Sequence, residues 1–215
     1  MNTILLGDKK TFGITATFFE DVHTTELSMF AKGKNILAFR QGNEIFTTRW
    51  NLDELVLWLK DFISNLSEDP YPVDVAGIYA AEKDDNARNF DSDDEDVFDA
   101  YYDKLYEWNE RHRWHPASSG AILADVYVQL AGENMEISWD NRKLEYEDVE
   151  FLETMGGISI PKDDFISIMN EFLKAYANRG YWNNPPAMQN LSSFTIRGCC
   201  KYYCGNLFFL VWPAW

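Results

Sequence analysis

The stretch from residue 114 to residue 139 constrains the fold more than any other, because apolar and polar side chains alternate in it twice. A loop rich in proline, serine and glycine leads into the first alternating run, residues 124–130. The link Ala-Gly-Glu-Asn follows, and residues 135–139 then alternate in the same way. A period of two is typical of strands with one buried face, and a short glycine-containing link predicts a hairpin.

Three other stretches carry apolar residues at the three- and four-residue spacing of amphipathic helices, namely residues 52–66, about 95–113 and about 162–178. Asn51 and Glu54 predict a capping-box start for the first of these helices, and Pro161 suits the start of the last. Residues 2–49 alternate and contain turn signals, so they predict a β-meander. Residues 73–81 could form a further short strand. We therefore expect an α+β fold of antiparallel meander and hairpin strands, with three main helices packed on one face.

Composition changes twice along the chain, which predicts its domain organisation. Residues 82–96 are polar and are expected to form an exposed segment, whereas residues after 180 are aromatic and almost uncharged. We expect an N-terminal lobe of β-meander plus helix (1–81), a helix–hairpin–helix lobe (82–179) and an aromatic C-terminal tail (180–215). A single domain is the alternative. The tail could pack as strands, mediate an oligomer or mark a truncated end.

The net charge of −16, from 35 acidic and 19 basic residues, limits the possible partners. Such a chain repels phosphate backbones, so we expect no direct nucleic-acid binding. The negative charge favours a basic protein partner or a metal cation, or it serves only to keep the protein soluble. The sequence has no apolar run of membrane-spanning length and no signal peptide, and its three cysteines do not form a disulfide framework. We expect a cytoplasmic protein with no cofactor.

The acidic run that begins at residue 91 is the main candidate for partner binding. Acidic side chains at alternate positions are faintly similar to a calcium loop, but Asp96 replaces its glycine and Tyr102 its final glutamate, which excludes an EF-hand. A solvated loop is the alternative interpretation. To a basic protein, these carboxylates would present negative charges spaced like the phosphates of a nucleic acid. The candidate partner-binding residues are Asp91, Asp93, Asp94, Glu95, Asp96, Asp99 and Asp103.

A second candidate site lies where the second predicted helix ends. Two histidines three residues apart could share a helix face and bind a metal with Asp103 or Glu107, or they could act in acid–base chemistry. Alternatively they cap the helix, where cations favour the dipole. The neighbouring arginine could bind an anion or could neutralise the acidic segment. The candidate ligand-binding residues are His112, Arg113, His115 and Asp125.

The 114–139 stretch resembles a bacterial module that is sometimes found with metallopeptidase domains of the ImmA/IrrE kind, or in toxin–antitoxin and phage-defence loci. This chain departs from the pattern at Ala124, where proline is expected, and at Gln129, where arginine is expected. The resemblance implies a bacterial accessory or sensing module, and no peptidase motif follows it. The matching residues are His115, Ala117, Gly120, Ile122, Leu123, Asp125, Gly132, Glu133, Met135, Glu136, Ile137, Ser138 and Trp139.

These observations favour a non-enzymatic acidic binding protein of immunity, antitoxin or phage-defence type. Residues 91–103 would hold a basic protein partner, because complementary charge speeds association and sets specificity. The second hypothesis is a ligand- or metal-binding sensor or hydrolase with a pocket near residues 111–125. The third is a truncated regulatory or structural subunit whose tail docks on another chain.

Overall fold

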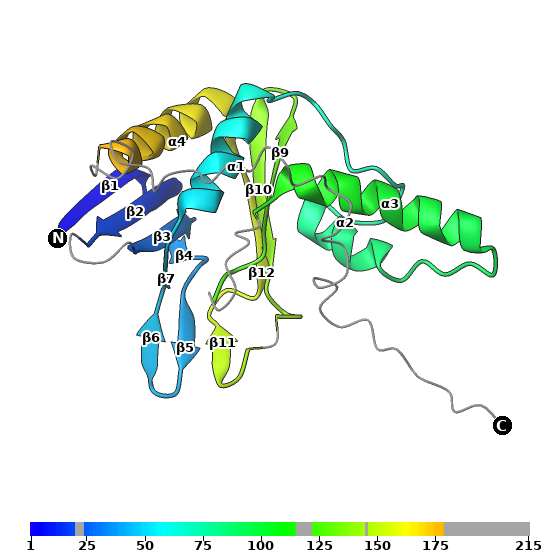
Figure 1. The fold of residues 1–215 in the computed structure, drawn as a ribbon, viewed down its shortest axis with the longest axis horizontal. Helices are drawn as coiled ribbons and strands as arrows, with labels where there is room; N and C mark the ends of the chain where they lie inside the picture. Colours follow the sequence, from blue (N-terminus) through cyan, green and yellow to red (C-terminus); the bar gives the residue numbers. More distant parts are fainter. Residues whose placement is uncertain (20–23, 115–121, 145, 179–215) are drawn as a thin grey trace, which may run out of the picture. The chain divides into compact units, whose positions relative to one another are not determined.

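The computed structural model describes residues 1–19, 24–114, 122–144 and 146–178 (Figure 1). Met1–Arg179 forms one compact unit. The predicted tail, residues 180–215, lies outside the described residues, and so does the hypothesis of an oligomer formed through it. No helix among the described residues has both the length and the apolar composition needed to cross a bilayer.

The described strands form three antiparallel sheets. The N-terminal sheet contains β1 (Asn2–Asp8), β2 (Phe12–Phe18), β3 (Thr25–Ala31) and β4 (Lys34–Asn35) in that order, with β7 (Thr48–Trp50) also paired to β3. The central sheet has the order β12 (Met155–Pro161), β10 (Asn134–Asp140), β9 (Val126–Ala131), β8 (Arg113–Trp114). A small third sheet has the order β11 (Val149–Phe151), β5 (Phe39–Gln41), β6 (Glu44–Phe46).

Within the described residues, four helices accompany the sheets: α1 (Asp53–Ser64), α2 (Ala80–Ala87), α3 (Glu95–His112) and α4 (Lys162–Ala177). The predicted α+β class is therefore confirmed, and α2 is an addition to the three expected helices. The predicted capping box at the start of α1 is wrong, because Leu52 rather than Asn51 is the N-cap and no side chain caps the helix. Asn51 lies one residue earlier, where its Oδ1 accepts a hydrogen bond of 2.9 Å from the Asp53 N–H. The predicted hairpin is also present, as β9 and β10 in antiparallel register.

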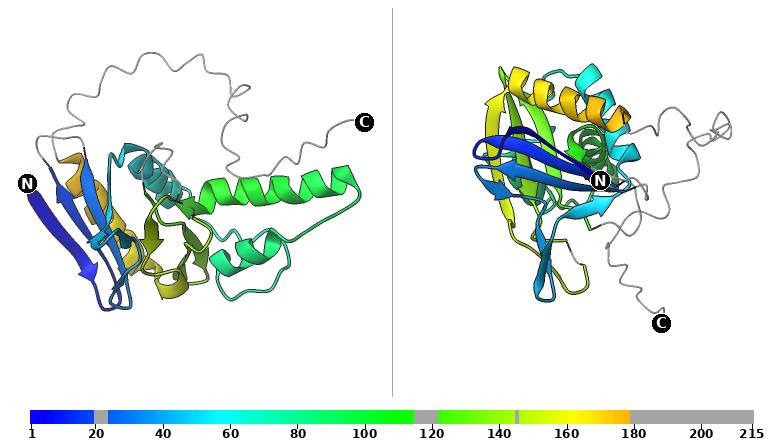
Figure 2. Two further views of the ribbon diagram at one scale, coloured as in Figure 1. Left: turned by 90° about the horizontal axis from the view of Figure 1, so that it is seen from below. Right: turned by 90° about the vertical axis from the view of Figure 1, so that its left-hand side faces the viewer.

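The main apolar core lies between the N-terminal sheet, the central sheet, α1 and α4. Figure 2 shows α4 lying across β1 and β2. The ring of Phe165 on α4 stacks on Phe12 of β2 at a centroid distance of 5.9 Å. Val128 of β9 lines the same interior as Ile14 and Phe165. Alternation along β2 and β9 thus directs one face of each strand into this core, as the sequence predicts.

Helix α2 covers the other face of the central sheet, so helices lie on both of its faces. The Ala80 N–H donates to Glu136 Oε1 at 2.6 Å, and the Ala81 N–H donates to Ser138 Oγ at 3.2 Å. These bonds satisfy two of the N–H groups that a helix start leaves unpaired. Gly157 on β12 permits the close approach, because a Cβ there would lie 2.5 Å from the Tyr79 ring.

Two expectations for the segment before α3 are wrong. No strand forms between residues 73 and 81, where the chain runs as a loop into α2. Residues 82–96 are not an exposed polar segment throughout, since Asp84 and Ala87 are buried. The boundary that we predicted between residues 81 and 82 falls inside α2.

Candidate protein-binding interface

Helix α3 has one face that is buried in the protein and an opposite face that is acidic and exposed. Its fully buried side chains, Leu105, Trp108 and His112, follow three- and four-residue spacing on one face. Acidic residues recur at the same spacing on the opposite face, and all of them are exposed. At 1.5 Å per residue they span about 21 Å of the helix axis. We call these five residues the acidic stripe: Asp96, Asp99, Asp103, Glu107 and Glu110.

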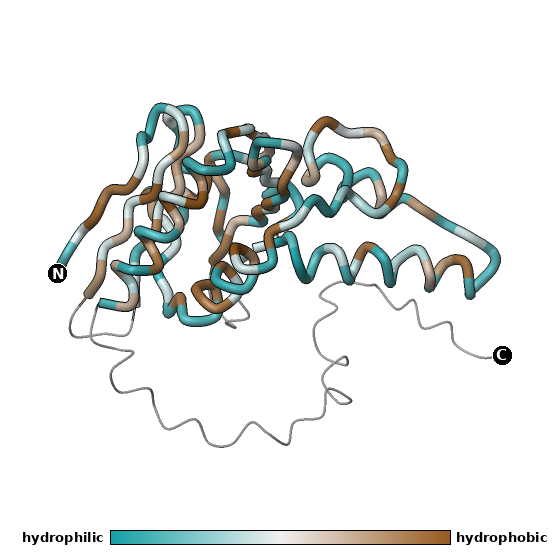
Figure 3. The backbone as a smooth tube through the Cα atoms, turned by 90° about the horizontal axis from the view of Figure 1, so that it is seen from above, coloured by the Kyte–Doolittle hydropathy of each residue, from teal (hydrophilic) through white to brown (hydrophobic). Residues whose placement is uncertain are grey.

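The acidic stripe is not neutralised from within. None of its five carboxylates forms an ion pair with any lysine, arginine or histidine in the part of the chain that the structure describes. Figure 3 shows that the tube where α3 begins is hydrophilic. The exposed aromatic ring of Tyr106 lies on the same side of the helix, between Asp103 and Glu110 in helical register. Tyrosine is enriched at protein–protein interfaces, and acidic side chains near it would steer a partner of opposite charge.

All seven predicted partner-binding residues are exposed. Asp91, Asp93 and Asp94 precede α3, and Glu95 begins it. The other three belong to the acidic stripe. The sequence interpretation missed Glu107 and Glu110, although continuing the helical spacing beyond Asp103 would have found them.

Asp94 has an internal role that distinguishes it from the other six. Its Oδ1 accepts hydrogen bonds from the backbone N–H groups of Asp96 at 3.1 Å and Val97 at 3.3 Å. It is therefore the N-cap of α3, in the geometry that aspartate at this position favours. Its carboxylate fixes where the acidic stripe begins.

Two predicted ligand-binding residues, Arg113 and Asp125, bind each other. The Arg113 guanidinium donates from Nε to Asp125 Oδ1 at 2.5 Å and from Nη2 to Oδ2 at 2.7 Å. Asp125 is buried, and burial raises the pKa of its carboxyl while Arg113 opposes the rise. This bidentate pair ties β8 to the start of β9 and uses the donors that would otherwise hold an anion.

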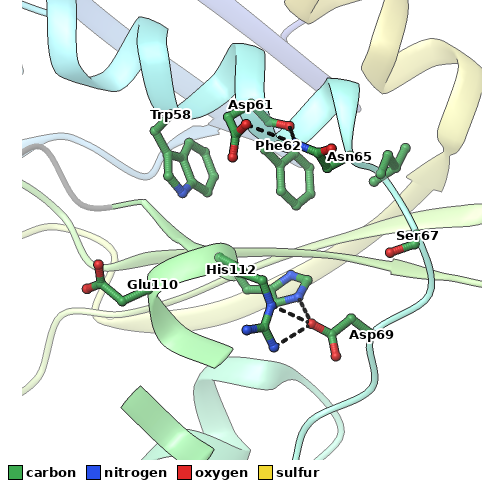
Figure 4. Close-up of a pocket in the computed structure, with 10 residues that line it drawn as sticks. Trp58, Asp61, Phe62, Asn65, Ser67, Asp69, Glu110 and His112 are labelled. Atoms are coloured by element: carbon green, nitrogen blue, oxygen red, sulfur yellow. Dashed lines mark hydrogen bonds and ion pairs between the residues drawn. The ribbon is translucent and has the colours of Figure 1, made fainter. Parts of the chain in front are cut away.

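His112, another predicted ligand-binding residue, is buried at the end of α3. Its Nε2 lies 2.9 Å from Asp69 Oδ2, and its Nδ1 lies 2.9 Å from the Val128 carbonyl oxygen (Figure 4). Arg111 also donates to Asp69 Oδ2, at 2.9 Å. Burial raises the pKa of Asp69, but hydrogen bonds from His112 and Arg111 outweigh it and lower the pKa overall.

The suggested metal site of His112 with Asp103 or Glu107 is wrong, because those carboxylates lie on the opposite face of α3. Within the described ranges, no group of three or more His, Cys, Asp or Glu residues could hold a metal ion. His115, the remaining candidate, lies outside these ranges. A ligand site near residues 111–125 stays a prediction.

A buried polar network centred on Asp84 was not predicted. Arg88 donates to Asp84 Oδ2 from Nε at 2.9 Å and from Nη2 at 2.6 Å, and the Tyr127 hydroxyl donates to the same oxygen at 3.0 Å. Asn109 Nδ2 and the Tyr71 hydroxyl donate to Oδ1 at 3.0 Å and 3.4 Å. Burial raises the pKa of Asp84, but the interactions with Arg88, Asn109 and Tyr127 outweigh that rise. The pKa is therefore lower than usual overall, and the carboxylate stays ionised. The network holds α2 against α3 and β9.

Comparison with known proteins gives no family assignment. No model of a known protein family matches the chain, and no curated protein matches it. A crystal structure of CdiI from Burkholderia dolosa AUO158 is similar at a TM-score of 0.43 and 14% sequence identity, over 80% of this chain and 99% of that chain. Both values are too low to assign a shared fold or function, and the resemblance of residues 114–139 to a bacterial module stays a prediction.

Proposed function

We propose that this chain is a non-enzymatic binding protein of immunity, antitoxin or phage-defence type, and that it holds a basic protein partner on the acidic stripe of α3. The observation that carries this proposal is the arrangement of five exposed carboxylates on one helix face without an internal cation among the described residues. Like charges at this spacing repel one another and reduce helix stability. A basic partner would relieve that repulsion.

The chemistry of the stripe favours a partner that normally binds nucleic acid. Five charges over about 21 Å place one negative charge about every 5 Å, against one per 3.4 Å along a single DNA strand. A protein surface built to follow phosphates therefore meets a comparable row of negative charge. Such a partner would be blocked when the stripe occupies its basic surface.

The test is capture of partners from native lysate by the immobilised full chain, identified by mass spectrometry at rising salt. Between about 0.1 M and about 1 M salt the Debye length falls from about 10 Å to about 3 Å, so a basic partner should be released across this range. The triple variant Asp99→Lys/Asp103→Lys/Glu107→Lys should capture at least about tenfold less.

A control variant separates the stripe from net charge. Glu44→Lys/Glu133→Lys/Glu171→Lys makes the same charge change at three exposed positions on β6, the β9–β10 turn and α4. It should capture the partner as the unmodified chain does. Equal loss in both variants, or capture that does not change with salt, would contradict the proposal.

A further inference from the structure

A cavity of about 140 Å³ lies between α1 and the last turn of α3, where the acidic stripe ends (Figure 4). The C-terminal half of α1, the loop that follows it and residues 110–112 form its walls. Pockets for drug-sized molecules usually measure about 300–1,000 Å³. This cavity therefore suits a single side chain rather than a cofactor or metabolite.

One wall of the cavity is aromatic. The rings of Trp58 and Phe62, one turn apart on α1, stack at a centroid distance of 5.3 Å and an interplanar angle of 15°. The ring of Phe62 also meets His112 edge-on, with centroids 6.0 Å apart. An aromatic face attracts a cation that lies within about 6 Å of its centroid.

The rim of the cavity is negative. Asp61 and Glu110 are exposed, and neither carboxylate forms an ion pair with a described cationic side chain. Asn65 Nδ2 donates to Asp61 Oδ1 at 2.9 Å, which holds that carboxylate at the end of α1. The last turn of α1 contains no basic residue, so its C-terminal partial negative charge is not compensated within the helix.

The arginine and histidine side chains that line the cavity are already engaged. Arg111 and His112 both contact Asp69 Oδ2, each at 2.9 Å. Asp61 and Glu110 are therefore left to attract a positive group from outside.

We propose that this cavity receives one arginine side chain of the basic partner, an inference that rests on the proposed function. Glu110 belongs both to the acidic stripe and to the cavity wall, so the cavity is continuous with the proposed interface. An arginine has a flat guanidinium that stacks on an aromatic ring and forked donors that fit carboxylates. A lysine offers only a compact point charge and fits less well.

The probe for this proposal is the peptide acetyl-Gly-Arg-Gly-amide, titrated into the full chain with ¹⁵N-labelled tryptophan. The indole Nε1 resonance of Trp58 is assigned with Trp58→Phe and followed by NMR. We expect a saturable shift with the arginine peptide, a weaker effect with the lysine peptide, and none with the citrulline peptide, which keeps the shape and lacks the charge.

Conservative variants locate the binding. Asp61→Asn and Glu110→Gln should each weaken the peptide roughly fivefold, as expected for a partly exposed charge pair. Glu171→Gln on α4 makes the same charge change elsewhere and should leave the affinity unchanged.

The outcomes distinguish this proposal from the proposed function. No saturable shift with the arginine peptide, or an equal shift with the citrulline peptide, overturns the arginine pocket. If the lysate still yields a salt-sensitive basic partner that depends on the acidic stripe, only the pocket proposal fails. Absence of salt-sensitive capture overturns the proposed function instead.

Discussion

Two neighbouring acidic segments of this chain have opposite environments. In α2, Asp84 is buried and receives donors from four side chains, and Asp85 pairs with Arg142 at 2.7 Å and with Lys143. From Asp91 to Glu110, the acidic side chains of the approach and the stripe are exposed and pair with no described cation. The presence of a run of acidic residues in the sequence therefore does not show whether those residues stabilise the fold or bind a partner. The presence of internal donors decides whether the charge stabilises the fold or is left for a partner.

The largest expected effect is on stability at Asp84. Asp84→Ala should lower the free energy of unfolding by about 2–3 kcal/mol, because the buried hydroxyl of Tyr127 and the amide of Asn109 lose their acceptor. Denaturant unfolding measures the loss. Asp93→Ala, an exposed aspartate nine residues later, should stay within about 0.5 kcal/mol of the unmodified chain. Equal losses would contradict the distinction between the two segments.

The same comparison predicts a pH dependence. The pKa of Asp84 lies below its ordinary value of 3.8. A depressed carboxyl pKa contributes stability that is fully present above the ordinary value and is lost as pH falls through the folded-state pKa. The difference in unfolding free energy between the unmodified chain and Asp84→Asn should therefore be constant above about pH 5 and shrink below about pH 4. A difference that grows as the solution is acidified would contradict this sign.

A smaller effect is expected at Asp94, which lies in the exposed segment and is the N-cap of α3. Asp94→Ala should cost about 1 kcal/mol, because two N–H groups of α3 lose their acceptor. Asp94→Asn keeps an acceptor at the N-cap and should cost only a few tenths of a kcal/mol. Thermal unfolding of the two variants makes the comparison, and equal losses would show that the cap contributes nothing.

The smallest effect should have the opposite sign. Asp103 lies four residues from both Asp99 and Glu107, so Asp103→Asn removes two like-charge repulsions. It should stabilise the fold by about 0.2–0.5 kcal/mol at low salt, and the gain should fade as salt is added. A protein that is stabilised by this change while its partner binding weakens would indicate that the stripe serves binding rather than folding.

Local periodicity predicted much of the fold. The β9–β10 hairpin, the presence of α1 and the extent of α3 all follow from patterns within a single stretch of sequence. The exposed residues at the start of the acidic stripe were found for the same reason. Helix α2 was missed because its eight residues carry several charges and only a short apolar pattern.

The charge of the chain, its α+β class and the spacing of the acidic residues on α3 were determined by the sequence itself, because each depends on composition or on neighbours along the chain. Tertiary structure decided which charges remained available. Asp84 is internal because Asn109 of α3 and Tyr127 of β9 donate to it beside Arg88, which follows on its own helix, and Arg113 is engaged because folding brings Asp125 to it. The cost of burying a charge depends on donors that are distant in sequence, so only the folded chain separates structural carboxylates from those left for a partner.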